Sequence, residues 1–214
     1  MKQPRLILVV ACALLTLHSK LHFCQAAVGA IITPTIFNLF LNPACSNGFY
    51  NRQAFLAAAT SFPLFGTSGP FASQKRELAA FFAHVSHETG GGCFKDEEGN
   101  NDRYHGRGPI QLTGRANYQA AGDYLKVDLV DNPDRVAKDP TLAFKTAIWF
   151  WMIAQAPGGT CHSVLNSQGF GATTRIINGI ECNSGNRPEQ ADRVDLFQTF
   201  CGKLGVSYSG QLYC

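Results

Sequence analysis

The stretch SQKRELAAFFAHVSHETGGGCFKDEEG, residues 73–99, joins a helical pattern to a glycine break and a group of acidic residues. Its apolar residues recur at i, i+3, i+4 and i+7, the spacing of one stripe along an α-helix: Leu78, Phe81, Phe82 and Val85. The pattern predicts a helix over 74–89, with Ser73 capping its start and Gly90 ending it. The acidic residues at and beyond the helix end are the first candidates for a functional site.

Glu88 lies at the end of this predicted helix. It follows Val85 by three positions and Phe81 by seven, which places it about 20° from Phe81 at the edge of the apolar stripe. A carboxyl half-buried beside aromatic rings has its charged form disfavoured, so we expect a raised pKa. A group of that kind can act as a general acid. The alternative is a helix-end glutamate that extends into water.

A second acidic group lies just beyond the glycine break and is the candidate for a general base. Asp96, Glu97 and Glu98 follow Cys93, and composition does not distinguish among the three. A base must be held in place, whereas three glycines make a loop flexible, so a disulfide at Cys93 could fix the loop. The alternative is a solvated acidic loop.

Residues 1–26 have the pattern of a secretory signal peptide. Basic residues precede an apolar run over 6–17, and alanines follow at 26–27. The run is too short to span a bilayer, and no later segment approaches that length. We therefore predict a secreted, extracellular protein with residues 27–214 as a single domain, without a membrane partner.

Removal of this segment takes Lys2, Arg5 and Lys20 from the chain, so the formal net charge falls from +3 to zero. A chain without excess positive charge lacks the usual attraction to nucleic acid, so we expect no such partner. We also expect a monomer. Six of the eight cysteines remain, and an even number in a secreted chain favours disulfides, although six allow 15 full pairings.

The remaining sequence is mainly helical in pattern. Helices are predicted at 33–41, 52–61, 171–178 and 188–204. Another is opened by Asp139-Pro140, runs through Trp149 and Trp151 to Met152, and is apolar on most sides, as expected of a central buried helix. Strand signals are limited to short pieces near 106–112. The sequence thus predicts a mainly α fold with a small β element and a long irregular middle.

Motifs for other chemistries are incomplete. The H-E-x-x-H zinc pattern fails because Gly91 stands where the second histidine is required. His84 and His87 could share a metal, but no third ligand lies nearby in sequence. Cys161-His162 could suggest a thiol nucleophile, although adjacent side chains usually point apart. We expect neither a metal nor a cofactor.

Five stretches occur along the chain in this order: HETGGGCFKDE, GRGPIQLTGRANY, AFKTAIWFWM, GFGATTRIINGIEC and ADRV. Together with FYNRQAFLAAATSFPLFGTSG and SQKRELAAFFAHVSHE, they resemble plant chitinases of glycoside hydrolase family 19 over essentially all of 27–214. The resemblance implies a helical, lysozyme-like fold with a substrate cleft. It also implies hydrolysis, with inversion, of β-1,4 linkages between N-acetylglucosamine units, with chitin and chitooligosaccharides as ligands.

The resemblance assigns roles residue by residue. Glu88 matches the general acid, Glu97 matches the general base, and Thr113 matches a hydroxyl residue that helps to hold the attacking water. An inverting pair needs room for this water, so we expect the carboxyls roughly 6.5–9.5 Å apart. An arginine–carboxylate pair of the family network is expected to steady Glu97. The other matching positions line the sugar cleft or surround the catalytic groups: His87, Tyr104, Gln111, Asn117, Asn178, Glu181 and Arg193.

Two disulfides are also implied by the resemblance, one joining Cys45 to Cys93 and one joining Cys182 to Cys214. Cys161 and Cys201 have no implied pairing, which leaves free thiols or a third bond.

The segments between Glu88 and Glu97, and between Glu97 and GRGPIQL, are short for the family, so the chain resembles its loop-reduced members. We expect a more open groove with fewer sugar subsites, and no chitin-binding module. The main rival function is a non-catalytic relative that only binds chitooligosaccharides. Such proteins often lose one of the two glutamates, whereas this chain keeps both. A third option is a peptidoglycan-cleaving enzyme, since lysozyme-like folds share the general cleft.

Overall fold

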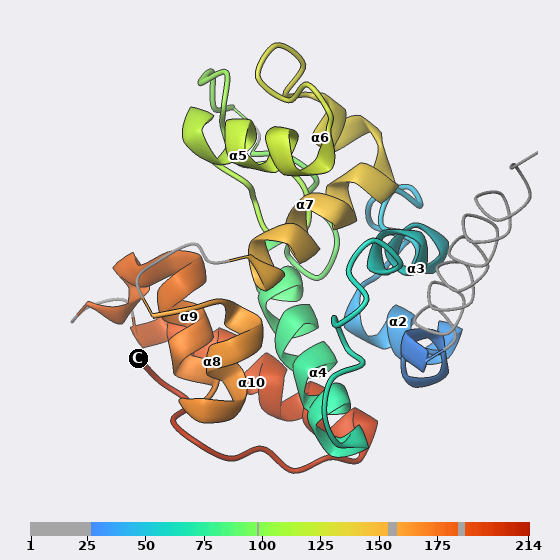
Figure 1. Cartoon of the computed structure of the whole chain (residues 1–214), viewed down its shortest axis with the longest axis vertical. Helices are drawn as coiled ribbons and strands as arrows, with labels where there is room; N and C mark the ends of the chain where they lie inside the picture. The colour runs from blue at the N-terminus through green and yellow to red at the C-terminus, as the bar shows by residue number, and fades with distance from the viewer. Residues whose placement is uncertain (1–26, 98, 154–157, 184–186) are drawn as a thin grey trace, which may run out of the picture.

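The computed structural model describes residues 27–97, 99–153, 158–183 and 187–214, so the predicted signal peptide, residues 1–26, lies outside the described residues. The described chain is built from helices joined by turns (Figure 1). After a helical segment at its start, the helices are α2 (Pro34–Phe40), α3 (Arg52–Ala59), α4 (Phe71–Glu88), α5 (Arg115–Leu125), α6 (Arg135–Lys138), α7 (Pro140–Met152), α8 (Cys161–Ser167), α9 (Phe170–Asn178), the 3₁₀ helix η1 (Gly179–Cys182) and α10 (Arg187–Leu204).

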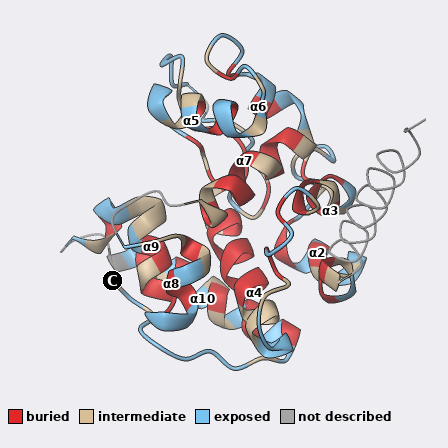
Figure 2. Cartoon of the chain, viewed as in Figure 1, coloured by how far each residue is buried: buried red, intermediate tan, exposed pale blue. Residues whose placement is uncertain are grey.

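The helix α4 confirms the predicted apolar stripe and runs through the middle of the molecule. Every residue from Glu77 to Ser86 is buried, so the helix is enclosed on all sides over this length (Figure 2). α10 packs along α4, which brings a segment more than 100 residues away in sequence beside it. The central position that the sequence suggested for α7 alone is therefore shared by α4.

The start of α4 differs from the prediction. The helix begins at Phe71, Pro70 is its N-cap, and Ser73 lies in the first turn instead of capping it. Proline fixes φ, here at −59°, and so pre-organises the entry into a helix without a side-chain hydrogen bond. The predicted end at Gly90 is correct, because that residue has a left-handed backbone with φ 57°.

The predicted helix after Asp139 is confirmed as α7. The carboxylate of Asp139 accepts hydrogen bonds from the amides of Thr141 and Leu142, and Pro140 opens the helix. Trp149 and Trp151 are buried in the core, as expected. α3 packs against α7, so these two helices and α4 position most of the aromatic core.

The helices α5, α6 and α8 occur where the sequence suggested irregular structure. The buried face of α5 contains one large residue, Tyr118, together with Ala121 and Gly122, so its apolar pattern is weak. α8 is opened by a capping box in which Thr160 and Ser163 satisfy each other's backbone amides, and serine at that place is a less recognisable signal than glutamate.

The small β element consists, among the described residues, of two isolated antiparallel bridges. Asp96 pairs with Arg107, and Arg107 pairs with Leu112. Within the same part of the chain, no helix is both long and apolar enough to cross a membrane.

Both implied disulfides are present, joining Cys45 to Cys93 and Cys182 to Cys214. Cys161 and Cys201 are free and buried. Burial raises the pKa of the Cys161 thiol far above its ordinary value and that of Cys201 to about 12. A thiol nucleophile at Cys161 is thus disfavoured, because the reactive species is the thiolate.

A buried carboxylate, Glu77 on α4, joins three parts of the fold. Its Oε1 atom accepts from Trp151 Nε1 at 2.9 Å and lies 2.5 Å from His162 Nδ1, while Oε2 accepts from the amide of Gly66 at 3.0 Å. The hydrogen bond with Glu77 raises the pKa of His162 above its ordinary value, and burial opposes this only in part. Folding therefore shifts His162 towards its protonated form relative to the unfolded chain.

This pair predicts a pH-dependent stability. A histidine whose pKa is raised on folding stabilises the fold fully below its unfolded pKa, near 6.5, and the contribution disappears as the pH rises through the folded value. Relative to His162→Asn, which keeps a neutral donor near Nδ1, the wild type should lose about 1–2 kcal/mol of unfolding free energy between pH 5.5 and 8.5. Urea unfolding of both proteins across this range measures it, and a constant difference would contradict the prediction.

Candidate active site

Glu88 is the last residue of α4, and 17% of its side chain is exposed. Nη2 of Arg193 on α10 donates to its Oε1 atom at 2.5 Å. The neighbour of this carboxyl is thus a guanidinium, where the sequence suggested aromatic rings, because α10 packs along α4 and places a cation at the helix end. The exposed part of the side chain leaves the carboxyl within reach of a substrate.

Arg193 is fully buried and also binds Glu181 side-on. Its Nε and Nη2 atoms donate to the two carboxylate oxygens of Glu181, each at 2.7 Å. The arginine was expected to steady Glu97, and the structure corrects this, because Arg193 holds Glu88. Glu97 lies beyond the glycine turn and takes its partners from its own loop.

Glu181 is the centre of a wider polar group. Asn178 Nδ2 donates to its Oε1 atom at 2.9 Å, and His87 Nε2 lies 3.9 Å from the same atom. Burial alone would raise the pKa of Glu181, but the hydrogen bonds and charge of Arg193 outweigh it and hold that pKa below the ordinary value. His87 Nδ1 lies 2.6 Å from Asp192 Oδ2. The structure therefore brings four predicted site residues around Glu88.

Glu97 is held by hydrogen bonds within its own loop. Its amide donates to the carbonyl of Gly106 at 2.9 Å, and two residues earlier the carbonyl of Lys95 accepts from the amide of Gly108 at 2.8 Å. The Oε2 atom of Glu97 accepts from Asn100 Nδ2 at 2.9 Å and from the amide of Gly106 at 3.3 Å. Backbone pairing thus fixes the position of Glu97, and the two amide donors orient its carboxylate.

The turn that connects the two acids is held by hydrogen bonds and a disulfide despite its glycines. Residues 90–92 all have left-handed backbone, with φ of 57°, 75° and 93°, a conformation that side-chain-bearing residues rarely adopt. The hydroxyl of Thr89 accepts from the amide of Gly92 at 2.9 Å, and the Cys93 amide donates to the Thr89 carbonyl at 2.8 Å. The bond from Cys93 to Cys45 then anchors the chain where it leaves for Glu97.

Thr113 and Gln111 lie against the same glycine that contacts Glu97. A Cβ atom built on Gly106 would be 2.7 Å from Gln111 Oε1 and 3.3 Å from Thr113 Oγ1. The Thr113 hydroxyl donates to the Gln111 carbonyl at 2.7 Å, and Gln111 adopts a left-handed backbone with φ 49°. A side chain at 106 would displace the amide of Gln111, so the glycine leaves room for these polar groups beside the residue that binds Glu97.

Asn117 and Tyr104 lie at the edge of this group. Asn117 Nδ2 donates to the carbonyl of Thr113 at 2.9 Å. The Tyr104 hydroxyl donates to the carbonyl of Val130 at 3.1 Å, and its ring packs on Tyr118 with centroids 5.5 Å apart. The structure therefore places Asn117 near Thr113, whereas Tyr104 is half-buried and turned towards the 118–130 region.

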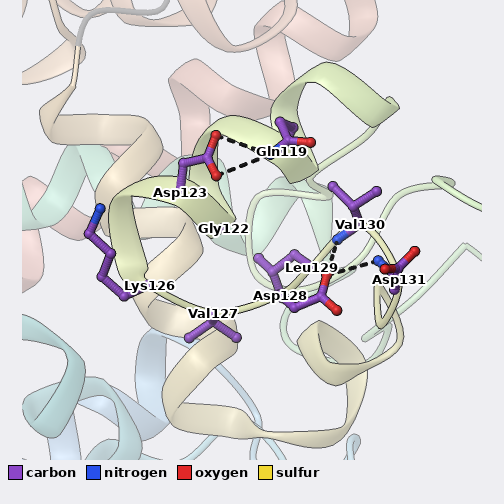
Figure 3. Close-up of a pocket in the computed structure, with 9 residues that line it drawn as sticks. All are labelled: Gln119, Gly122, Asp123, Lys126, Val127, Asp128, Leu129, Val130 and Asp131. Carbon is purple, nitrogen blue, oxygen red and sulfur yellow. Dashed lines mark hydrogen bonds between the residues drawn. The ribbon is translucent and has the colours of Figure 1, made fainter.

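A separate pocket of about 450 Å³ lies beside the end of α5 (Figure 3). Its lining includes three carboxylates, but Gln119 binds Asp123, and the amides of Val130 and Asp131 bind Asp128. None of the predicted site residues lines this pocket.

Two residues near the acids were missed from the sequence, Asn100 and Asp192. Asn100 lies in a short polar loop with no motif, and Asp192 precedes Arg193 on α10, so neither carried a local signal. Among the described residues, no three histidine, cysteine or carboxylate side chains form a metal-binding group.

The two carboxylates end one helix and begin the next loop, and each is fixed by different partners. Glycoside hydrolases use a pair of carboxylic acids, so the two glutamates are candidates for that chemistry. The sequence model of the family described as "Chitinase class I" matches residues 31–102 and 95–214. The chain belongs to this family, glycoside hydrolase family 19.

Relatives with solved structures and curated names agree with this assignment. Chitinase 8 of Oryza sativa subsp. japonica is 44% identical, over 98% of this chain and 95% of the relative. The acidic 27 kDa endochitinase of Solanum lycopersicum is 42% identical, over 96% of each chain. The crystal structure of a family GH19, class IV chitinase from Zea mays superposes with a TM-score of 0.77 at 36% identity, over 86% of this chain and 98% of that chain. The expected lysozyme-like helical fold is thereby confirmed.

Proposed function

We propose that this protein is a secreted endochitinase that hydrolyses β-1,4 linkages of N-acetylglucosamine polymers with inversion at the anomeric carbon. The observation that carries the proposal is that the two carboxylates accept hydrogen bonds from different kinds of donor. Glu88 is bound by a buried guanidinium, whereas Glu97 is bound by neutral amide donors of its loop. The different partners distinguish the two acids, and the family resemblance assigns the role of acid to Glu88 and that of base to Glu97.

In the proposed reaction, protonated Glu88 gives its proton to the glycosidic oxygen as the bond to the anomeric carbon breaks. A water molecule attacks that carbon from the opposite face, and Glu97 takes the proton that the water releases. Asn100 and Gly106 bind Oε2 of Glu97, so Oε1 receives the proton. The Thr113 hydroxyl uses its own hydrogen on the Gln111 carbonyl, so its oxygen accepts the second hydrogen of the water. The water is then left with a lone pair directed at the sugar.

The stereochemistry of the first product tests this mechanism. Proton NMR of a fresh digest of an N-acetylglucosamine hexamer should show the α-anomer at the new reducing end before mutarotation. The same spectra report the position of the cleaved bond and the rate. An initial β-anomer would rule out single displacement.

Glu97→Gln separates the proposed base from its acidic neighbour. Glutamine keeps an oxygen that can accept from Asn100 and Gly106 but cannot take a proton, so kcat on the hexamer should fall by about 10²–10⁴-fold. Asp96→Asn is the matched control, since it also removes one negative charge from the loop and should stay within about threefold of the wild type. Equal losses in the two variants would show that loop charge, and not a base at Glu97, supports turnover.

Secretion and a monomeric state belong to the same proposal. One disulfide involves Cys93, between the two acids, and the other involves Cys182, next to Glu181, and stable disulfides form in oxidising compartments. Residues 1–26 carry the export signal in this proposal, and residues 27–214 form the catalytic domain. Mass spectrometry of the secreted protein tests the cleavage site, and analytical ultracentrifugation tests the oligomeric state.

A further inference from the structure

His84 lies one helical turn before Glu88 on α4, with its side chain completely buried. Its ring stacks on Phe170 of α9, with centroids 4.6 Å apart and planes 15° apart, and lies 6.1 Å from Trp151 of α7. Its polar partners are Thr173 on α9 and Arg193 on α10. Because the ring has no access to solvent, it cannot touch a substrate and can act only through these neighbours.

The hydrogen-bond partners of His84 determine where its proton lies. Arg193 Nη1 can only donate, so His84 Nδ1, 3.1 Å away, must be the unprotonated acceptor. Thr173 gives its one hydroxyl hydrogen to the carbonyl of Phe170 at 2.6 Å, so it must accept from His84 Nε2, which lies 2.8 Å away. The imidazole is therefore neutral, with its hydrogen on Nε2. Burial and the charge of Arg193 also lower its pKa well below the ordinary value.

This neutral acceptor completes the coordination of Arg193. One edge of the guanidinium, Nε with Nη2, binds Glu181, and Nη2 also donates to Glu88. Nη1 is bound by His84 from another helix. A planar group held by Glu181 alone can tilt about that edge, whereas a contact at Nη1 fixes the plane and with it the direction of Nη2.

We propose that His84 is a positioning residue for Glu88, acting through Arg193. It accepts from Nη1 and so holds the guanidinium in the orientation that directs Nη2 at the acid. This inference rests on the proposed function, in which Glu88 donates the proton. A misplacement of the acid by about 1 Å can lower turnover by about 100-fold, so a buried residue can influence the rate without substrate contact.

Two isosteric variants separate the two contacts of the ring. Asparagine places an acceptor near the site of Nδ1 and can keep Arg193 in position, whereas glutamine places an amide near Nε2 and serves Thr173 instead. We expect His84→Asn to stay within about threefold of the wild-type kcat and His84→Gln to lose about 10- to 100-fold, with KM changed less than about threefold in both. Both variants lose the stacked ring, so their Tm values should fall by similar amounts. Equal kcat values, or a faster His84→Gln enzyme, would overturn the proposal.

A double-substitution cycle distinguishes positioning from general damage. If His84 acts through Glu88, adding His84→Gln to Glu88→Gln should cause no further loss of the residual turnover. Losses that multiply would show that His84 acts independently of the acid and would reject the proposal. Phe81→Leu, a buried change on the same helix at a ring that packs on Phe55 and Phe65, is the stability control and should leave kcat within about threefold.

A measurement without turnover keeps this inference separate from the proposed function. Nitrogen-15 NMR of the histidine rings should show His84 as the neutral Nε2–H form throughout pH 4–8. The Arg193 Nη1 signal should be sharp or shifted in the wild type and His84→Asn, which offer Nη1 an acceptor, but not in His84→Gln. A protonated or Nδ1–H ring would overturn the positioning role even in an active enzyme. Failure of the wild type to cleave the hexamer would instead reject the proposed function, while the spectra would still decide whether His84 holds Arg193.

Discussion

Glu88→Gln is expected to lower kcat for an N-acetylglucosamine hexamer by about 10²–10⁴-fold, while binding of the hexamer changes little. Glutamine has the shape of glutamate, and its Oε1 atom can still accept from Nη2 of Arg193, so the buried polar group around Glu181 should persist. Only the transferable proton is lost. Initial rates by chromatography and affinity by calorimetry, measured on the same preparations, test the two parts of this expectation.

Glu189→Gln is the charge-matched control, because Glu189 is an exposed acid in the first turn of α10. It should behave as the wild type. A Glu88→Gln enzyme with more than half of the wild-type rate would remove Glu88 from the role of acid. A wild type that binds the hexamer but turns it over no faster than Glu88→Gln would favour the non-catalytic binding protein.

Arg193→Met is expected to cost about 3–5 kcal/mol of unfolding free energy, because it leaves the buried Glu181 carboxylate without its cation. A change of this size is a large part of the stability of a typical domain and corresponds to a fall in Tm of roughly 6–20 °C. Turnover should also fall, since Nη2 of Arg193 no longer holds Glu88. Urea unfolding and rates on the hexamer measure the two effects.

A second substitution identifies the cause of that loss. Glu181→Met in the Arg193→Met background removes the unpaired buried charge and should recover part of the stability, but not the activity. Arg103→Met is the matched surface control, because its pair with Asp131 is exposed and should contribute less than about 1 kcal/mol. A double variant less stable than Arg193→Met alone would show that unpaired charge is not the source of the destabilisation.

The fold was predictable where a helix has a strong apolar pattern. α7 combines an Asp139 cap, a proline at its first position and a dense apolar run, and α4 has four large apolar residues on one stripe. α5 was not predicted because its buried residues are one tyrosine, an alanine and a glycine, which form almost no apolar pattern in the sequence. Such helices are selected by the surfaces they pack on, which local sequence does not contain.

The site was predictable only in part for a similar reason. The helix end singled out Glu88 from spacing, but the choice of Glu97 among three acids depended on the family resemblance. The partner of Glu88, Arg193, is 105 positions away and reaches it only through the packing of α10 on α4. No local pattern could show that a guanidinium would serve Glu88 and not Glu97.

The pairing on either side of Glu97 also bears on how this family varies. The backbone of residues 95–97 pairs with that of residues 106–108, as in a short hairpin, and the loop between Glu97 and Gly106 lies beyond this pairing. This pairing makes the position of Glu97, the proposed base, independent of the length of the loop that follows it, and doubling a loop costs only about 0.6 kcal/mol in closure entropy. The length of this loop can therefore change without moving Glu97, the proposed base.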